Sequence, residues 1–315
     1  MSLTVVGSIA YDAVKTPAGE RERMLGGAAT HFALAASFFD DEVRVVGPVG
    51  DDFDEASWDV LGTRGIVTDD VERVPGGTTF FWKGEYHDNL NSRETLVTDL
   101  NVFETFEPKL SQAARDCDVL FLANIQPDLQ RGVREQCAGA RFVAMDSMDL
   151  WINIAHESLV ATIKGVDCLI LNDEELELLT GKPNFVSAAR EVLNWGPTAP
   201  TAVVAKQGKY GAALFTADGV FALPAYPLED VVDPTGAGDS FAGGFVGTIA
   251  AHPEAEVSHE LLVKAMVYGT ALASFNVEAF GTERVAELTR EEITTRVDEL
   301  QRMTTFEHEA IALRS

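Results

Sequence analysis

The sequence predicts an α/β fold: a three-layer α/β/α sandwich with a mostly parallel central sheet and a small β lid. Three observations lead to this prediction. Short β-branched and apolar runs alternate with helical segments, as in a parallel sheet that helices cover on both faces. The alternation is interrupted once, where strands follow one another without a helix. Polar residues stand where several of the strands end.

The N-terminal part of the chain begins the alternation. Residues Leu3 to Ile9 form a short apolar run that predicts a buried strand, and Gly26-Gly27 then opens an alanine-rich helix that we expect to reach Phe39. A second strand over 42–49, a helix over 54–64 and a third strand from 65–67 onward follow.

The segment from about 71 to 106 breaks this pattern. Its strands are expected without an intervening helix, at Val71–Val74, Thr78–Tyr86 and Thr95–Leu100. Together with residues about 13–24 they predict a small β element that stands off the main sheet, and such an excursion is often an active-site lid. We therefore expect one domain over 1–315, with a lid from about 13–24 and 71–106.

The alternation resumes after the lid. The expected strands lie at 119–123, 142–145, 168–171 and 201–205, followed by a hairpin of 211–215 and 220–223; the expected helices lie at 129–138, 152–163, 173–180, 186–195, 237–251, 258–275 and 290–303. Ligands of open α/β sheets bind beyond the carboxyl ends of the strands, so the polar residues there are candidates for a site. Taken singly, each is better explained as a helix cap. These residues are Asp12, Asp51, Asn124, Asp146, Asn172 and Lys206.

Composition narrows the classes of partner. The 315 residues carry a formal net charge of −26. Nucleic-acid binding needs a basic surface, so we expect no nucleic-acid partner. The charge indicates either adaptation to high salt, where counterions screen self-repulsion, or an acidic protein of an ordinary habitat.

The cysteines and the N-terminus indicate the cytoplasm. The three cysteines, Cys117, Cys137 and Cys168, are odd in number and widely spaced, which argues against a disulfide framework or a zinc site. The first ten residues lack the basic segment and apolar core of a signal peptide. No apolar run reaches the length of about 18 residues that a membrane span needs, so we expect no membrane association.

The stretch from Val231 to Ala250 carries the clearest chemistry. Glycines at Gly236 and Gly238 allow the backbone to approach a ligand closely, and the helix that follows leaves its first N–H groups unpaired. Such a helix start attracts anions. Asp239 stands beside it as a carboxylate that can accept a proton. This layout predicts phosphoryl transfer to a hydroxyl group.

The string Asp233-Pro234-Thr235-Gly236-Ala237-Gly238-Asp239, with Gly243 and Gly244 after it, resembles the C-terminal signature of the ribokinase-like (PfkB) carbohydrate kinases. The resemblance implies a ribokinase-like fold and an ATP-dependent kinase with Mg²⁺. It also implies an anion hole at Gly236, Ala237 and Gly238 and a catalytic base at Asp239.

Further motifs extend the resemblance to both substrates. On the acceptor side, Gly7 to Asp12 resembles the family's first strand, whose aspartate, here Asp12, binds substrate hydroxyls, and Gly26 and Gly27 resemble the glycines that admit the sugar. On the donor side, the motifs imply Glu175 for the metal and five other residues for the nucleotide. These are Asn172 of the Asn-x-x-Glu motif, Lys206, Gly208 and Gly211 of the Lys-x-Gly-x-x-Gly segment, and Asn276 at the adenine ring.

One departure from the family pattern concerns the acceptor. The family carries an asparagine about four residues after the double glycine, whereas this chain has His31, which we expect near the substrate or facing the core or lid. Arg93, just after the lid's polar stretch, is a candidate for a carboxylate or phosphate of the acceptor. We expect a sugar or sugar derivative, with a nucleoside as the alternative because four aromatic residues of the predicted lid could stack on a base: Phe80, Phe81, Trp82 and Tyr86.

A sensor that binds sugar or nucleotide without catalysis is the competing function from a different class. Such a relative would be expected to lose Asp239 or the glycines, and all are present. The sequence therefore favours an enzyme over a sensor. The lid is also a candidate surface for a homodimer.

Overall fold

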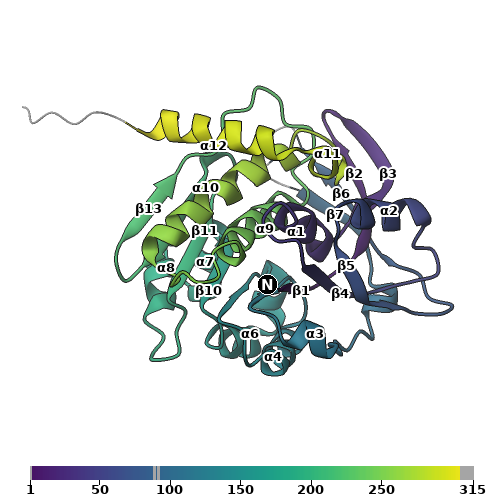
Figure 1. Cartoon of the computed structure of the whole chain (residues 1–315), viewed down its shortest axis with the longest axis horizontal. Helices are drawn as coiled ribbons and strands as arrows, with labels where there is room; N and C mark the ends of the chain where they lie inside the picture. The colour runs from purple at the N-terminus through teal and green to yellow at the C-terminus, as the bar shows by residue number, and fades with distance from the viewer. Residues whose placement is uncertain (1, 88–89, 91–92, 306–315) are drawn as a thin grey trace, which may run out of the picture.

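A nine-stranded sheet forms the centre of the computed structural model, which describes residues 2–87, 90 and 93–305 (Figure 1). The strands lie in the order β13-β12-β11-β10-β9-β8-β1-β4-β5, and every neighbouring pair is parallel except β11–β12 and β12–β13 at one edge, where β12 is reversed. Their bounds are β1 Leu3–Val6, β4 Val43–Val49, β5 Val67–Arg73, β8 Val119–Leu122, β9 Phe142–Met145, β10 Cys168–Asn172, β11 Ala202–Lys206, β12 Ala212–Thr216 and β13 Val220–Leu223.

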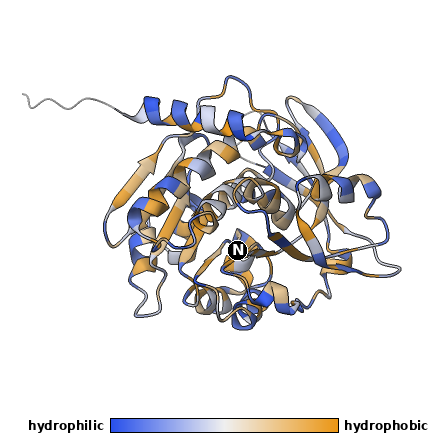
Figure 2. Ribbon diagram, in the orientation of Figure 1, coloured by the Kyte–Doolittle hydropathy of each residue, from blue (hydrophilic) through white to orange (hydrophobic). Residues whose placement is uncertain are grey.

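Helices cover both faces of this sheet, because successive residues of each strand point to opposite sides. One face packs against α1 (Ala28–Ala36), α2 (Glu55–Thr63), α9 (Ala237–Ala250), α10 (His259–Asn276), α11 (Glu283–Glu287) and α12 (Arg290–Thr304). The other packs against α3 (Gln112–Arg115), α4 (Pro127–Gln136), α5 (Asp149–Ile154), α6 (His156–Ile163), α7 (Asp173–Thr180) and α8 (Phe185–Leu193). Hydrophobic residues concentrate on the central strands, whereas α12 is mostly hydrophilic (Figure 2). The structure thus confirms the predicted three-layer sandwich.

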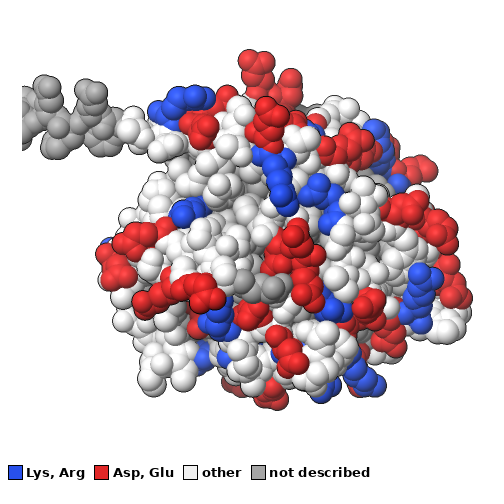
Figure 3. Space-filling model, viewed as in Figure 1, with Lys and Arg blue, Asp and Glu red and all other residues white. Residues whose placement is uncertain are grey.

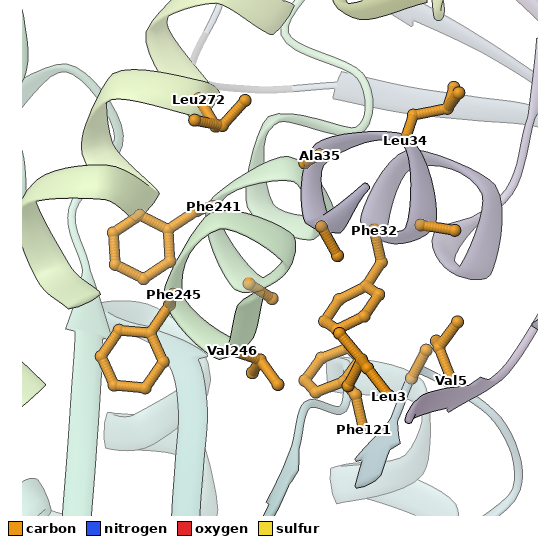
Figure 4. Close-up of a cluster of buried hydrophobic side chains, with 14 of the residues drawn as sticks. Leu3, Val5, Phe32, Leu34, Ala35, Phe121, Phe241, Phe245, Val246 and Leu272 are labelled. Atoms are coloured by element: carbon orange, nitrogen blue, oxygen red, sulfur yellow. The ribbon is translucent and has the colours of Figure 1, made fainter. Parts of the chain in front are cut away.

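Helix α9 lies between α1 and α10 above the sheet (Figure 4). Phe32 of α1 stacks on Phe121 of β8 with ring centroids 4.3 Å apart, and both are fully buried. A β-carbon at Gly243 would lie 2.3 Å from the carbonyl oxygen of Phe32, and one at Gly244 would lie 2.8 Å from that of Tyr268. The glycines therefore allow the close helix approach that fixes where α9 begins.

A second, four-stranded sheet stands at one side of the molecule, in the order β3-β2-β6-β7 (Figure 1). Its strands are β2 Ala10–Thr16, β3 Gly19–Gly26, β6 Phe80–Tyr86 and β7 Arg93–Asp99, and we call it the small sheet. The expected assignment of Val71–Val74 to this element is wrong. Val71 pairs with Gly47 of β4 and packs against the main core, so this run is the edge of the central sheet.

Several local boundaries also differ from the prediction. The helix expected over 152–163 is broken at Ala155, whose φ of −137° is not helical, so α5 and α6 are separate. Helices α3 and α11 are not predicted from the sequence, because four and five residues are too few to show a helical period. Short 3₁₀ turns occur at Asn101–Phe103 and Gly208–Tyr210.

The surface reflects the acidic composition. Asp and Glu side chains are spread over the visible face, with fewer Lys and Arg among them (Figure 3). Within the described ranges, no helix combines the length and the apolar character needed to span a membrane.

Candidate active site

The loop before α9 is held in place by Asp233. This residue is fully buried, and its two carboxylate oxygens accept hydrogen bonds from the N–H groups of Thr235 (2.9 Å) and Gly281 (3.0 Å). Gly236 follows as the N-cap of α9 with a φ of 75°, which lies in the left-handed region that favours glycine. A β-carbon there would also lie 2.3 Å from Nδ1 of His31. The turn is therefore fixed by an acid on one side and a histidine ring on the other.

The first turn of α9 presents backbone donors beside a carboxylate. Among the described residues, the N–H groups of Gly236 and Gly238 have no hydrogen-bond acceptor, whereas the N–H of Ala237 lies 3.3 Å from the carbonyl oxygen of Pro234. A β-carbon at Gly238 would lie 2.8 Å from Nζ of Lys206, so the ammonium group faces this turn. The geometry forms a small cationic recess at a helix start.

Asp239 adjoins this recess. Burial raises its pKa above the ordinary value, and the neighbouring side chains of His31, Lys206 and Arg93 oppose the rise. The side chain is thus a carboxyl group that takes up a proton more readily than an exposed aspartate, with the cations Lys206 and Arg93 favouring its ionised form.

Further acids follow the ends of β9 and β10. Asp146 comes directly after β9, and its buried Oδ1 has no hydrogen-bond partner among the described residues. Burial raises the pKa of Asp146 well above its usual range; the charge of Asp239 adds to the rise and that of Lys206 opposes it. Burial also raises the pKa of Glu175, and the charge of Lys206 opposes this rise. Asp146, Glu175 and Asp239 therefore share one neighbouring cation.

Asn172 and Glu175 cap the N-terminus of α7 reciprocally. Oδ1 of Asn172 accepts from the N–H of Glu175 (2.7 Å), and Oε2 of Glu175 accepts from the N–H of Asn172 (2.9 Å). The cap is formed, and one oxygen of each side chain is engaged in it. This arrangement fixes the carboxylate of Glu175 at the edge of the sheet near Lys206.

Asp12 lies on β2, in the small sheet, and its side chain is only 6% exposed. Burial raises the pKa of Asp12 to about 7; the charges of Asp233 and Asp239 add to this rise, while the N–H of Gly27 and the charge of Arg93 oppose it. A β-carbon at Gly26 would lie 2.0 Å from Oδ2 of Asp12, so this glycine makes room for the carboxylate. Gly27, with a φ of 95°, passes too close to Ser8 for any side chain.

An aromatic face adjoins Asp12 on the small sheet. Trp82 of β6 is the register partner of Asp12, and such partners point to the same face of a sheet. The indole lies across Gly84, where a β-carbon would meet it at 2.2 Å. Arg93 lies 5.7 Å from the centroid of the indole ring. The small sheet thus places a carboxylate, a flat ring and a cation together.

Side-chain contacts join the small sheet to the loop before α9. Oγ1 of Thr16 donates to the carbonyl oxygen of Val232 (2.8 Å), and Oγ1 of Thr235 donates to the hydroxyl of Tyr86 (3.3 Å). The strands that carry Asp12 and Trp82 are therefore attached to the loop that leads into the anion recess.

The expected role of Asn276 at the adenine ring is contradicted by its position. Its side chain is fully buried, its Nδ2 donates to the carbonyl oxygen of Thr235 (2.7 Å), and its Oδ1 accepts from Oγ of Ser240 (2.9 Å). Nδ1 of His31 lies 3.1 Å from the same Oδ1. Because its side chain is fully buried and both ends of its amide are hydrogen-bonded inside the protein, Asn276 is not exposed to a nucleotide.

His31 is likewise turned inward. Its side chain is 2% exposed, so the structure supports an orientation toward the core and contradicts a direct contact with the acceptor. Gly211 is tightly packed, since a β-carbon there would lie 2.0 Å from the carbonyl oxygen of Leu223. Gly208 has a φ of 53° in the turn after β11. Both glycines are thus explained by the turn itself.

The structure brings most of the candidate residues to one edge of the central sheet. The charge of Arg93 lowers the pKa values of Asp12, Glu175 and Asp239, and the charge of Lys206 lowers those of Glu175 and Asp239, so these five residues are neighbours. Asp146 belongs to this group but is not singled out by the sequence, where it is one of several polar residues after strands. The sequence feature that could have identified Asp146 is an acidic residue directly after a fully buried strand.

Comparisons with known proteins agree with this geometry. A family model described as pfkB family carbohydrate kinase matches residues 2–288. A cytidine kinase from Thermococcus kodakarensis is 30% identical over 253 residues, which cover 78% of this chain and 87% of the relative. An ATP-dependent ribose-1-phosphate kinase from Halopiger xanaduensis is 27% identical over 228 residues, or 71% of this chain and 72% of the relative.

The fold is shared with solved kinase structures. A nucleoside kinase from Burkholderia thailandensis in complex with inosine superposes with a TM-score of 0.78 at 21% identity, covering 95% of this chain and 98% of that one. The predicted ribokinase-like fold is thereby confirmed. The chain therefore belongs to the pfkB family of carbohydrate kinases, and it is an ATP-dependent phosphotransferase that acts on a hydroxyl group of its acceptor.

Proposed function

We propose that Asp239 is the general base of this kinase and that the first turn of α9 is its anion hole. The observation that carries the proposal is the pair of N–H groups at Gly236 and Gly238, which have no acceptor within the described part of the chain, with Asp239 next in sequence and the ammonium group of Lys206 facing Gly238. Ala237 completes the turn, but its N–H is directed at Pro234. The glycines therefore contribute the main donors.

The reaction needs little covalent help from the protein. An acceptor oxygen forms a bond to the γ-phosphorus of ATP while the bond to the leaving oxygen of ADP breaks, and the proton of the hydroxyl passes to Asp239. Most of the catalysis is positioning and charge stabilisation. Because burial raises the pKa of Asp239, the carboxylate is a better proton acceptor late in the transfer. Lys206 is proposed to neutralise phosphate charge. The nucleotide is proposed to lie beside the backbone around Gly208 and Gly211 and beside the helix cap at Asn172.

Magnesium fits the acids of the site. Mg²⁺ prefers oxygen ligands and keeps several waters, so it needs only one or two protein carboxylates. Glu175 has one carboxylate oxygen outside its helix cap, and the buried Oδ1 of Asp146 has no partner among the described residues. In that same part of the chain, no cluster of three or more His, Cys, Asp and Glu side chains forms a ready metal cage. We propose that Glu175 holds Mg²⁺ with water and ATP phosphates, where the ion would neutralise phosphate charge.

For the acceptor, we propose a nucleoside. The two oxygens of Asp12 can accept hydrogen bonds from two adjacent ribose hydroxyls, which Gly26 and Gly27 allow to approach. Trp82, on the same face of the small sheet, offers its ring to a base, and Arg93 lies beside it. The relatives that act on cytidine and other nucleosides favour this class over a free sugar. A sugar derivative remains the second candidate because of the ribose-1-phosphate kinase.

The test combines a substrate panel with one variant. ADP formation is measured with a set of nucleosides and with ribose and ribose 1-phosphate, for the wild type and for Asp239→Asn. We expect kcat/KM to be highest for a nucleoside and the variant to lose about 10²–10⁴-fold in kcat while still binding ATP in calorimetry. A preference for a sugar would reject the nucleoside, and near-normal turnover by the variant would reject the base.

Two coarser proposals complete the function. We propose a cytoplasmic location, supported by three buried free thiols at Cys117, Cys137 and Cys168. We also propose a homodimer through the small sheet, supported by its edge strand β7, on which Leu96 is 45% exposed. Sedimentation of the purified protein measures the number of subunits and so tests the proposed homodimer directly.

A further inference from the structure

A chain of hydrogen bonds runs beneath the anion recess from α1 to the turn before α9. His31 of α1 and Asn276 of α10 are joined between Nδ1 and Oδ1 at 3.1 Å. Asn276 then donates from Nδ2 to the carbonyl oxygen of Thr235 at 2.7 Å. His31 is 2% exposed and Asn276 fully buried, so water does not compete for these bonds.

The direction of each bond is determined by the chemistry of the groups. A carbonyl oxygen can only accept, so the nitrogen of the Asn276 amide must face Thr235 and its oxygen must face His31. Nδ1 of His31 is therefore the protonated ring nitrogen. Nε2 is buried without a partner in the described part of the chain, and burial lowers the pKa of His31. The ring is a neutral donor with a defined tautomer.

The last bond controls a peptide group of the anion hole. A peptide unit is planar, so the carbonyl of Thr235 and the N–H of Gly236 lie in one plane and point in opposite directions. A donor that holds the carbonyl oxygen therefore also sets the direction of the Gly236 N–H. The His31 ring adds a second restraint, because its atoms would lie 2.3–2.4 Å from a β-carbon at Gly236.

We propose that His31 and Asn276 are positioning residues, which aim the N–H of Gly236 at the transferred phosphoryl group through the peptide unit of Thr235 and Gly236. This inference rests on the proposed function of that turn as an anion hole. It gives His31 a role in the reaction without contact to either substrate.

The test uses two replacements of His31 that differ in whether they can donate a hydrogen bond. His31→Leu removes the Nδ1–H donor and fills its place with an apolar side chain of moderate size. His31→Asn can place an amide N–H near the position of Nδ1. We expect His31→Leu to lower kcat by about 10–100-fold, somewhat less than the loss of a whole anion-hole donor, with KM for ATP and acceptor within about threefold of wild type. His31→Asn should recover most of this loss.

Two further variants separate positioning from stability. Thr248→Val removes a different buried hydroxyl bond in α9, to the carbonyl oxygen of Gly244 (2.7 Å), and should lower the thermal transition without lowering kcat. Asn276→Asp keeps the shape of the side chain but removes the donor to Thr235, and should lower kcat as His31→Leu does. It also keeps the inference testable if His31→Leu does not fold.

A spectroscopic measurement tests the network without activity. Nitrogen NMR of the histidine-labelled wild type should show His31 as the Nδ1–H tautomer, assigned by its loss in His31→Asn. The other tautomer would overturn the inference, as would equal kcat for the two His31 variants or a kcat for Asn276→Asp equal to that of wild type. If Asp239→Asn is inactive while these variants are normal, the positioning role fails and the proposed function stands. Near-normal Asp239→Asn turnover would instead reject the proposed base.

Discussion

Replacing Asp12 with asparagine should make the protein more stable and a poorer enzyme. The carboxyl group of Asp12 is almost completely buried, and burial, together with the charges of Asp233 and Asp239, raises its pKa to about 7. The opposing influences are the N–H of Gly27 and the charge of Arg93. At neutral pH the folded protein therefore keeps an acid that is reluctant to ionise.

The size of the effect follows from the two pKa values. The shift from 3.8 to about 7 corresponds to about three pH units, and each unit is worth 1.36 kcal/mol. The folded state binds the proton more tightly than the unfolded chain, so this group lowers stability as pH rises from about 4 to about 7. Above that range the full destabilisation, up to about 4 kcal/mol, is present. Asparagine does not ionise and avoids it.

The assay is urea unfolding of the wild type and of Asp12→Asn at pH 8 and at pH 5, followed by tryptophan fluorescence. We expect the variant to be more stable at pH 8 by a few kcal/mol, and its advantage to shrink by about 2–3 kcal/mol at pH 5. Its kcat/KM for the acceptor should fall at least about tenfold while the affinity for ATP is kept. A variant less stable than wild type at pH 8, or an advantage independent of pH, would refute the reasoning.

Three other substitutions test the donor side. Gly238→Val places a branched side chain where Lys206 faces the turn, at a position whose φ is not in the left-handed region. We therefore expect loss of activity in a protein with an unchanged thermal transition, and full activity of the folded variant would reject the anion hole. Gly236→Val would clash with His31 and should instead destabilise the fold. Glu175→Gln keeps much of the cap at α7 but removes the charge, so the Mg²⁺ concentration for half-maximal rate should rise. An unchanged Mg²⁺ dependence with a small loss of stability would leave Glu175 as a cap alone.

The middle of the central sheet is well predicted from the sequence because β1, β4, β8 and β9 are short, fully buried runs. The strand Phe142–Met145 and the helix Asp173–Thr180 have the expected bounds. Val71–Val74 is misassigned because an edge strand of the main sheet and a strand of the small sheet have the same local pattern. Only the long-range pairing of Val71 with Gly47 distinguishes them, and local periodicity does not contain it.

In the candidate site, too, local features are predictable from the sequence and long-range contacts are not. The turn at Gly236 and the acid at Asp239 are adjacent in the sequence, so their association is predictable. His31 and Asn276 are separated by 245 positions, and their hydrogen bond is visible only in the fold. The sequence motifs therefore place each of them near a substrate on its own, whereas in the fold they satisfy each other's buried polar groups. Asp146 is one of several strand-end residues in the sequence, and only its unpartnered oxygen, among the described residues, sets it apart.

The presence of two separate sheets has a consequence for how this enzyme can diversify. On the proposed assignment, the groups that recognise the acceptor, Asp12, Trp82 and Arg93, belong to the small sheet, whereas Lys206 and Asp239 belong to the central body. Mutations in four strands can therefore alter acceptor range while Lys206 and the first turn of α9 stay in place, although a change at Arg93 also removes a charge that acts on Asp239. The contact of Tyr86 with Thr235 limits this freedom, because a relative that changes its acceptor must still preserve the contact between the small sheet and the loop before α9.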